Sequence, residues 1–346
     1  MRTDELGKIA RRRKLDLVLV ADQANIRALT GINCDNAILQ LATRNSQLET
    51  LLYTDFRYMP MVHRVAPELK CGDIKRLGVG KRRPRRFERI GYESSISHAK
   101  FLEWQKKFPK AKFVDVSKDL AAIRAVKTLE EIAAIRAAEK LDCEIWETAR
   151  GRFRAGMTER QMARIIQKLM IEKGEGEAFA TIVCVGKNAA ECHHEPDDTV
   201  WNGREPVLVD MGVKLGGVCS DLTRNLVTGV SRTYRQVYQL VLKANLAAIA
   251  AAKPGMTGRQ LDKVARDVIK KGGFGKCFGH SLGHGVGYEI HEAPYASKKS
   301  DMVLKPGMLV TIEPGVYLED NLGVRIEDLV LITETGCEVL SSNAFK

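Results

Sequence analysis

Two acidic residues, Asp210 and Asp221, stand in otherwise apolar, strand-like segments of this 346-residue chain. The turn-like residues 214–217 between them predict a β-hairpin. With those four residues as the loop, Asp210 lies directly opposite Asp221, and the two Cβ atoms are about 5 Å apart. Two carboxylates held so close repel each other unless a cation lies between them. The pair therefore suggests a metal site.

Glu313 and Glu327 repeat this arrangement further along the chain. They stand in apolar segments that flank residues 318–322, and with a three-residue loop they also face each other. Either pair alone fits solvent-facing positions of a half-exposed strand, whereas two such pairs together favour a metal site. Both registers stay open, because β-bulges are common next to functional sites.

Five of the seven histidines lie between residues 193 and 291. They are the neighbours His193 and His194, and a run that contains His280, His284 and His291. A set of four carboxylates and one imidazole favours Mn, Co, Fe or Zn over thiolate chemistry, and it suits two ions that share bridging carboxylates. Two ions can activate a water and polarise a carbonyl. The residue types therefore predict metal-assisted hydrolysis, without identifying the substrate.

Helix-start signals mark the elements that must position these side chains. Thr128, Thr158 and Thr257 are each followed three residues later by Glu or Gln, which is the pattern of a capping box. The last two threonines belong to similar segments, 155–162 and 254–261. This similarity fits one favoured helix start used twice, or an internal duplication. The acidic strand pair that follows each copy favours duplication.

Apolar strand-like runs alternate with short helical segments in the first third of the chain, which predicts an α/β domain over residues 1–120 and a second domain over residues 121–346. The formal net charge of +12 falls in this first third and peaks in the run 75–89. The run fits a polyanion-binding patch or, as we favour, a solvated basic face. It lacks the interleaved aromatic residues that stack on single-stranded nucleic acid.

The composition, 45% hydrophobic and 28% charged, is that of an ordinary globular protein. The first residues lack the apolar stretch of a secretory signal, and no apolar run approaches the roughly 20 residues of a membrane span. The eight cysteines are scattered without a Cys-x-x-Cys pair, which indicates reduced thiols. We therefore expect a cytoplasmic protein without membrane contact.

The chain closely resembles the pita-bread metallopeptidases, in the branch of creatinase, prolidase and aminopeptidase P. The matching motifs of the second domain are Val209-Asp210, Ser220-Asp221-Leu-Thr-Arg224, Gly283-His284-Gly-Val-Gly287, Ile290-His291-Glu292, Thr311-Ile-Glu313-Pro-Gly315 and Gly323-Val-Arg325-Ile-Glu327-Asp328. The first domain resembles the creatinase-type N-terminal domain at Asn25-Ile-Arg-Ala-Leu-Thr-Gly31 and Thr54-Asp55-Phe-Arg57-Tyr58. The resemblance implies an α+β protein, with a small α/β creatinase-type N-terminal domain and a pita-bread catalytic domain that has an internal pseudo-twofold duplication.

The resemblance also implies a role for each predicted ligand. Asp210 is expected to hold one metal ion in a bidentate manner, and Asp221 and Glu327 to bridge two ions. His284 and Glu313 are expected to complete the coordination of the second ion. Glu313 is also the expected general base, placed to take a proton from the attacking water.

For the substrate, the resemblance implies that His193 and His291 hydrogen-bond the scissile carbonyl or the tetrahedral intermediate. His280 is expected to shape the pocket for the proline ring. Cys192 stands where the family usually has proline before the substrate histidine. His194 therefore stays an alternative to His193.

Three further residues near the ligands have weaker implied roles. Arg325 is expected to orient the bridging carboxylates or to pair with a substrate carboxylate, and a structural ion pair is the alternative. Tyr317 is a candidate substrate-binding residue. Cys219 points the same way as Asp221, and we expect it to be a packing residue rather than a ligand.

These roles predict an Xaa-Pro aminopeptidase, which releases the residue before proline by attack of a hydroxide that bridges two divalent ions, with Mn ahead of Co, Fe or Zn. The close alternative is an Xaa-Pro dipeptidase (prolidase), which needs a further cation for the C-terminal carboxylate. The distant alternative is a non-catalytic pita-bread protein that only binds a partner. Proline-containing peptides as substrates, a homodimer and no nucleic-acid partner are also implied.

Overall fold

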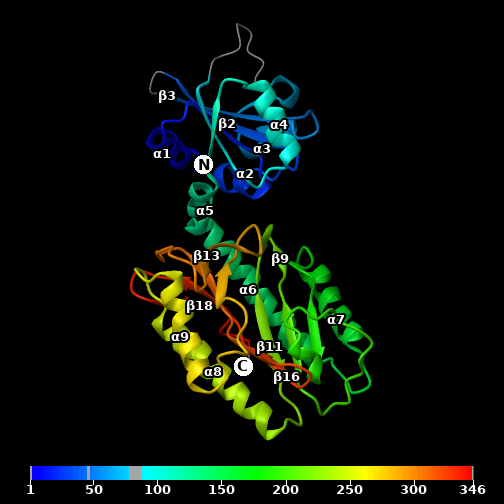
Figure 1. Ribbon diagram of the computed structural model, residues 1–346. Helices are drawn as coiled ribbons and strands as arrows, with labels where there is room; N and C mark the ends of the chain where they lie inside the picture. The colour runs from blue at the N-terminus through cyan, green and yellow to red at the C-terminus, as the bar shows by residue number, and fades with distance from the viewer. Residues whose placement is uncertain (1, 45–46, 78–86, 345) are drawn as a thin grey trace. The chain divides into compact units, whose positions relative to one another are not determined.

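The computed structural model describes residues 2–44, 47–77, 87–344 and 346. Residues 78–86, which hold most of the predicted basic run, lie outside the described residues. The chain divides into two compact units, Met1–Arg124 and Ala125–Lys346 (Figure 1). In the described part of the chain, none of the helices combines the length and the apolarity that crossing a membrane requires.

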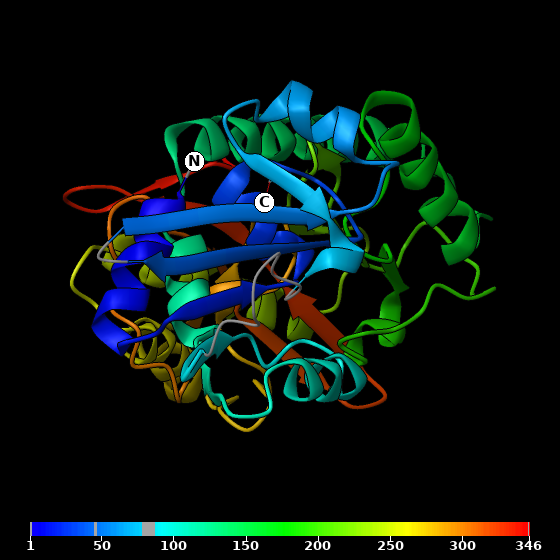
Figure 2. The ribbon, with the colours of Figure 1, turned by 90° about the horizontal axis from the view of Figure 1, so that it is seen from above.

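The N-terminal unit is built on one mixed sheet with strands in the order β4-β3-β2-β1-β5-β6 (Figure 2). β1 pairs antiparallel with β2 and parallel with β5. The strands are β1 (Leu17–Val20), β2 (Ala37–Arg44), β3 (Gln47–Thr54), β4 (Lys70–Asp73), β5 (Arg89–Tyr92) and β6 (Lys112–Asp115). The helices are α1 (Thr3–Arg13), α2 (Gln23–Thr30), α3 (Met59–Val65), the 3₁₀ turn η1 (Ile74–Arg76), α4 (His98–Lys107) and α5 (Ser117–Ala125).

Strand β1 is apolar throughout because both of its faces are covered. On one face Val18 packs with Ile26 of α2 in one core cluster. On the other face Leu19 packs with Trp104 of α4 in a second cluster. The N-terminal unit thus has a helix-covered core on each side of its sheet.

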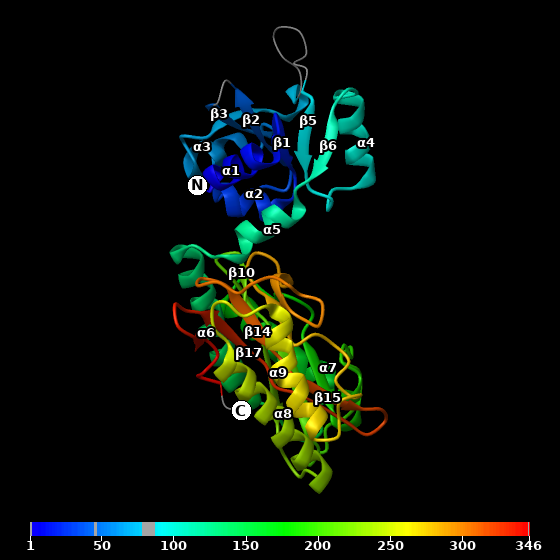
Figure 3. The same ribbon diagram turned by 60° about the vertical axis from the view of Figure 1, so that its left-hand side comes forward.

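The C-terminal unit contains longer helices and shorter strands. Its helices are α6 (Leu129–Arg150), α7 (Glu159–Lys173), the 3₁₀ turn η2 (Gly186–Ala190), α8 (Arg232–Ala251) and α9 (Gly258–Lys271). Helices α8 and α9 lie side by side in Figures 1 and 3 and pack closely on each other. Each of the helices α6, α7 and α9 begins with the predicted capping box, at Thr128, Thr158 and Thr257.

The strands of this unit form small sheets and hairpins. Two sheets have the strand orders β11-β8-β7 and β14-β17-β18, and the hairpins are β9-β10, β12-β13 and β15-β16. The strands are β7 (Ile182–Val185), β8 (Val207–Met211), β9 (Lys214–Leu215), β10 (Val218–Cys219), β11 (Leu222–Leu226), β12 (Gly283–Gly285), β13 (Glu292–Ala296), β14 (Leu309–Ile312), β15 (Gly315–Leu318), β16 (Leu322–Arg325), β17 (Asp328–Ile332) and β18 (Cys337–Val339).

The starts of α7 and α9 have matching backbone surroundings. Thr158 forms an isolated β-bridge with Val200, and Thr257 forms one with Val303. In both halves, the first amides of the helix donate to carbonyl oxygens of the segment that carries the bridge partner. This repeated scheme agrees with the internal duplication that the sequence predicts, and the molecule has the expected α+β architecture.

Candidate metal centre

Asp210 comes from β8, and Asp221 precedes β11. The prediction that these two residues pair directly is wrong, because Asp210 lies opposite Thr223 in the β8–β11 ladder. The loop consists of Gly216 and Gly217 alone, with φ angles of 60° and 67°. A two-residue type I′ turn needs positive φ at both positions, and two glycines meet that need without strain. The shorter loop changes the register, yet both aspartates still line one cavity.

The register predicted for the second acidic hairpin is confirmed. β14 pairs with β17 and β15 with β16 in one continuous antiparallel register. Glu313 and Glu327 occupy the facing positions between these two ladders. The backbone amide of Glu327 donates to the backbone oxygen of Thr223 at 3.2 Å. The second hairpin is thereby joined to the first.

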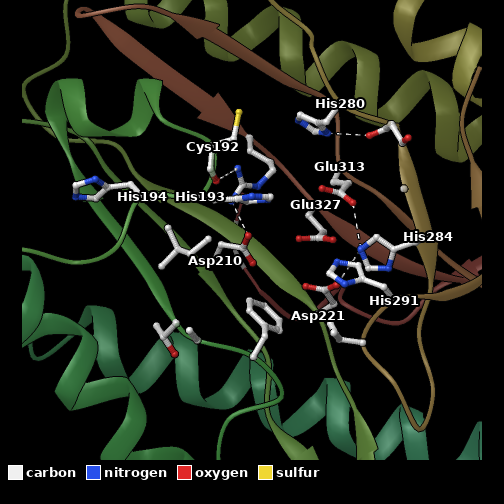
Figure 4. A pocket seen from close by; sticks show the side chains of 18 of the residues that line it. Cys192, His193, His194, Asp210, Asp221, His280, His284, His291, Glu313 and Glu327 are labelled. Atoms are coloured by element: carbon white, nitrogen blue, oxygen red, sulfur yellow. Dashed lines mark hydrogen bonds and ion pairs between the residues drawn. The ribbon is translucent and has the colours of Figure 1, made fainter. Parts of the chain in front are cut away.

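His284 of β12 completes a cluster with these acids (Figure 4). Its Nε2 atom lies 3.6 Å from Asp221 Oδ2 and 3.4 Å from Glu313 Oε1. The Nδ1 atom donates to the backbone oxygen of Gly285 at 3.2 Å, so Nε2 carries the lone pair that faces the carboxylates. One ligand atom each from Asp221, His284 and Glu327 lies within 4.8 Å of the others. This tautomer and this grouping are those of a metal-binding imidazole.

Burial and mutual repulsion disfavour the charged forms of the clustered acids. Burial raises the pKa of Asp221, and the nearby charges of Glu327 and Asp210 raise that pKa further. Burial raises the pKa of Glu313 to about 8, and it also raises the pKa of Glu327. Burial lowers the pKa of His284 to about 4, which keeps the imidazole neutral. A bound cation reverses this balance, since it favours charged carboxylates and takes the lone pair of a neutral imidazole.

Arg325 orients two of the clustered acids, Asp210 directly and Glu327 through Thr223. Its Nη2 atom donates to Asp210 Oδ2 at 2.5 Å, and its Nε atom donates to Thr223 Oγ1 at 3.1 Å. Thr223 Oγ1 in turn donates to Glu327 Oε2 at 2.7 Å. The remaining Nη1 atom donates to the hydroxyl of Tyr317 at 2.9 Å. The guanidinium therefore orients one predicted ligand directly and another through a threonine.

The second carboxylate oxygen of Asp210 has no such support. Asp210 Oδ1 is buried and has no hydrogen-bond partner among the described residues. An unpartnered buried oxygen is costly, and a cation bound beside it removes the cost. This oxygen, the free lone pair of His284 and the clustered carboxylates together fit divalent metal ions with oxygen and nitrogen ligands.

The cluster lies in a cavity of about 570 Å³ within the C-terminal unit. All the predicted site residues except Tyr317 line it: Asp210, Asp221, His284, Glu313, Glu327, His193, His280, His291 and Arg325. Tyr317 lies behind the wall, with its hydroxyl 3.0 Å from His280 Nε2. Much of the remaining wall is apolar and includes Phe179, Ile182 and Ile290. The cavity thus combines a charged floor with an apolar wall, as ligand pockets commonly do.

His280 is fixed from helix α9. Its Nδ1 atom donates to the backbone oxygen of Ser281 at 2.8 Å, which leaves Nε2 to accept from Tyr317. The backbone oxygen of His280 accepts from Arg266 Nη2 at 2.8 Å, and Arg266 pairs with Asp262 on the same helix at 2.7 Å. The segment that carries His280 into the cavity is therefore held by a buried ion pair.

His193 and His194 point in opposite directions from neighbouring positions of the chain (Figure 4). The His193 ring extends over the cavity, whereas His194 Nε2 lies 2.7 Å from Glu159 Oε2 on α7. This geometry favours His193 as the substrate-facing member of the pair. The backbone oxygen of Cys192 accepts from Arg325 Nη1 at 3.3 Å. Cys219 is buried in a core cluster of the unit, as expected of a packing residue.

Several residues that support the cavity were not identified from the sequence, namely Glu139, Glu159, Thr223, Asp262 and Arg266. Glu139 is fully buried on α6, and its Oε2 atom accepts from the backbone amide of Asp221 at 3.2 Å. Asp262 is buried in the same way on α9. An acid on the apolar face of a helix was the available signal, because a buried carboxylate needs a partner. The sequence does not say where that partner lies.

Family models match nearly the whole chain. The model of metallopeptidase family M24 matches residues 133–334, and the model of the creatinase/prolidase N-terminal domain matches residues 2–126. The two matched segments correspond to the C-terminal and N-terminal units of the structure.

Curated relatives match the chain over part of its length. It is 45% identical over 188 residues to an Xaa-Pro dipeptidase of Pyrococcus furiosus, covering 54% of the chain and 54% of the relative. It is 45% identical over 186 residues to an Xaa-Pro dipeptidase of Lactobacillus helveticus, covering 53% of the chain and 50% of the relative. The match therefore spans about half the length of these relatives.

Solved structures match over the full length. A prolidase from Pyrococcus furiosus has a TM-score of 0.88 and 33% identity, covering 97% of this chain and 98% of that one. An X-Pro aminopeptidase from Thermotoga maritima MSB8 has a TM-score of 0.84 and 31% identity, covering 96% of this chain and 97% of that one. Both units thus have counterparts in each of these two proteins.

Proposed function

Because the chain belongs to metallopeptidase family M24, we propose that it is a metal-dependent dipeptidase that hydrolyses Xaa-Pro dipeptides. The observation that carries the proposal is the convergence of five ligand-type side chains in one cavity, which four further histidines line. Those five residues are Asp210, Asp221, His284, Glu313 and Glu327. The names of the relatives support the dipeptidase reading better than the aminopeptidase reading that the sequence favoured.

Two divalent ions bound by these residues, with Mn proposed as the native metal, would polarise the scissile carbonyl and lower the pKa of the attacking water. Asp210 would hold one ion, His284 and Glu313 the other, and Asp221 and Glu327 both. Glu313 takes the proton of the attacking water on its carboxylate. His284 keeps its own proton on Nδ1, where the backbone oxygen of Gly285 holds it.

The remaining polar residues of the cavity bind and orient the peptide. His193 and His291 donate hydrogen bonds to the oxygen of the scissile carbonyl, whose negative charge grows as the tetrahedral intermediate forms. His280, which Tyr317 holds in place, forms one side of the pocket for the proline ring. The apolar wall that includes Phe179 forms the non-polar side of the peptide site.

An Xaa-Pro aminopeptidase that acts on longer peptides is the second candidate, and the charge of the cavity favours it. A dipeptide brings its C-terminal carboxylate close to the reacting bond, where a cation must pair with it. Arg325 is already committed to Asp210 and Tyr317. Among the described residues that line the cavity, no other arginine and no lysine is present.

Turnover of Ala-Pro and of Ala-Pro-Ala by the metal-loaded protein separates the two candidates. A dipeptidase is expected to have a kcat/KM for Ala-Pro at least roughly tenfold higher than for the tripeptide. The reverse preference supports the aminopeptidase instead. Ala-Ala serves as the control for the need of proline. If the protein cleaves neither proline peptide with any of Mn, Co, Fe or Zn, both candidates are wrong.

A further inference from the structure

Glu159, the first residue of α7, is fully buried, and its carboxylate accepts four hydrogen bonds. The Oε1 atom accepts from the backbone amide of Val185 at 2.7 Å and from Asn188 Nδ2 at 2.9 Å. The Oε2 atom accepts from the backbone amide of Asp197 at 3.0 Å and from His194 Nε2 at 2.7 Å. One carboxylate thus binds both flanks of the chain segment 186–197.

The contact with His194 fixes the middle of this segment. The His194 side chain is 11% exposed, while that of Glu159 is 0% exposed, so the contact is shielded from solvent. Burial by itself lowers the pKa of His194, but the hydrogen bond and the charge of Glu159 leave that pKa above its ordinary value. A shielded, charge-assisted contact of this kind resists rotation of the ring.

The neighbouring residue, His193, points the other way, into the cavity (Figure 4). Its side chain lines the same cavity as His280 and His291. Since His194 is held on α7 and the segment is held at both flanks, His193 has little freedom to leave the cavity. The orientation of His193 therefore depends on the contacts that Glu159 makes.

The internal duplication allows the start of α7 to be compared with a matching helix start that lacks an acid. Helix α9 begins with the same capping box and the same kind of β-bridge as α7. At the position that matches Glu159, helix α9 has Gly258. A helix start of this geometry thus forms without a carboxylate, and the acid of α7 has another task.

We propose that Glu159 is a positioning residue, which holds His193 over the reacting bond through its contacts with His194 and with the flanks of segment 186–197. The proposal rests on the proposed function, because it assigns His193 to the oxygen of the scissile carbonyl. A metal ion shared by Glu159, His194 and Asp197 is the competing explanation for this cluster. It is disfavoured because N–H donors already occupy both oxygens of Glu159.

The decisive experiment is a double-mutant cycle between Glu159→Gln and His193→Ala in the metal-loaded protein. Glutamine keeps the size of the side chain but loses the charge and replaces one acceptor oxygen by a donor. With Ala-Pro as substrate, Glu159→Gln is expected to lower kcat roughly tenfold to a hundredfold, with KM changed by less than about twofold. In the His193→Ala background the same substitution is expected to leave kcat unchanged.

If Glu159 has a merely structural role, Glu159→Gln lowers kcat by the same factor in the wild-type and in the His193→Ala background. That result, or an unchanged kcat in the Glu159→Gln single variant, overturns the proposal. His194→Ala is the second variant if Glu159→Gln does not fold, and the same cycle is expected for it. His63→Ala, which removes an exposed histidine of α3 in the N-terminal unit, is the matched control.

A second measurement does not depend on turnover. In protein labelled with ¹⁵N at histidine, the His193 imidazole signal is assigned by its loss in His193→Ala. This signal is expected to shift or broaden in Glu159→Gln and to stay in place in His63→Ala. An unmoved signal, or a third bound metal ion per subunit that is lost in Glu159→Gln, contradicts the positioning role. If the wild type cleaves no proline peptide while the His193 signal moves, the proposed function fails and the positioning role stands.

Discussion

Arg325 Nη2 donates to Asp210 Oδ2 at 2.5 Å, and both side chains are almost fully buried, at 4% and 14% exposure. The same guanidinium donates to Tyr317 and to Thr223. With the backbone oxygen of Cys192, its planar fork serves four acceptors at once, which a lysine cannot do. Of the roles that the sequence left open for Arg325, the geometry favours orienting a ligand carboxylate over pairing with a substrate.

Arg325→Lys is therefore expected to weaken metal binding. The lysine keeps the positive charge but cannot hold Asp210 and Thr223 together, so the affinity for Mn is expected to fall by roughly 10- to 100-fold. Isothermal titration of the metal-free protein with Mn measures this change. Arg266→Lys, which alters the ion pair behind His280 instead, is the control and should keep the wild-type Mn affinity. Equal affinities in all three proteins would contradict the orienting role.

Removal of a bridging acid is expected to abolish activity together with metal content. Asp221→Ala and Glu327→Ala each delete a carboxylate that is proposed to contact both ions, and the N-terminal unit is expected to stay folded because it has its own cores. Elemental analysis should show fewer than two ions per subunit, against two in the wild type. Glu319→Ala, at an exposed position beyond β15, should keep both ions. Wild-type turnover by either bridging variant in metal-depleted buffer is the result that would refute the site.

His291→Ala is expected to act on the chemical step rather than on substrate binding. The His291 ring packs edge-on against His284, with ring centroids 4.3 Å apart, and its proposed hydrogen bond strengthens as charge develops on the carbonyl oxygen. Loss of one such donor typically lowers kcat by roughly a hundredfold or more. Steady-state kinetics with Ala-Pro measure the effect, and His98→Ala on α4 is the control. A change confined to KM would assign His291 to ground-state binding.

Much of this site could be predicted from local patterns. The facing positions of Glu313 and Glu327 follow from strand alternation and loop length, and the structure has that register. The three capping boxes are equally local, because each joins a threonine to a residue three positions on. Local rules succeed where the partners lie within one hairpin or one helical turn.

Two features of the site could not be predicted from local patterns. One depends on a turn that is shorter than expected, and the other depends on contacts between residues far apart in the sequence. Asp210 pairs with Thr223 because Gly216 and Gly217 form the whole loop. The sequence of residues 214–217 is equally compatible with a four-residue loop, so it does not determine the register. The contact of Glu159 with His194 joins residues 35 positions apart, and no periodicity predicts it. Such contacts are set by how α7 packs against the segment that precedes β8, which is a property of the folded unit.

The N-terminal unit has a buried acid of its own. Glu93 follows β5 and is fully buried, and its carboxylate accepts from the backbone amides of Ala21 and Asp22 and from Asn25 Nδ2. Burial raises the pKa of Glu93 to about 7, although these hydrogen bonds act in the opposite direction. The ordinary value for a glutamate is 4.5. Between these two pH values the folded protein holds a proton that the unfolded chain has lost.

This difference predicts how stability depends on pH. The contribution of Glu93 is fully present below about pH 4.5, and it is lost as the pH rises through about 7, because unfolding releases the Glu93 proton in this range and a higher pH favours that release. A shift of this size corresponds to about 3 kcal/mol. Glu93→Gln, which mimics the protonated form, should gain this amount relative to the wild type between pH 4.5 and pH 8 in urea unfolding of the N-terminal unit. Glu68→Gln, at an exposed position of that unit, should show no such gain. Parallel pH profiles for the wild type and Glu93→Gln would show that the buried carboxyl does not titrate in this range.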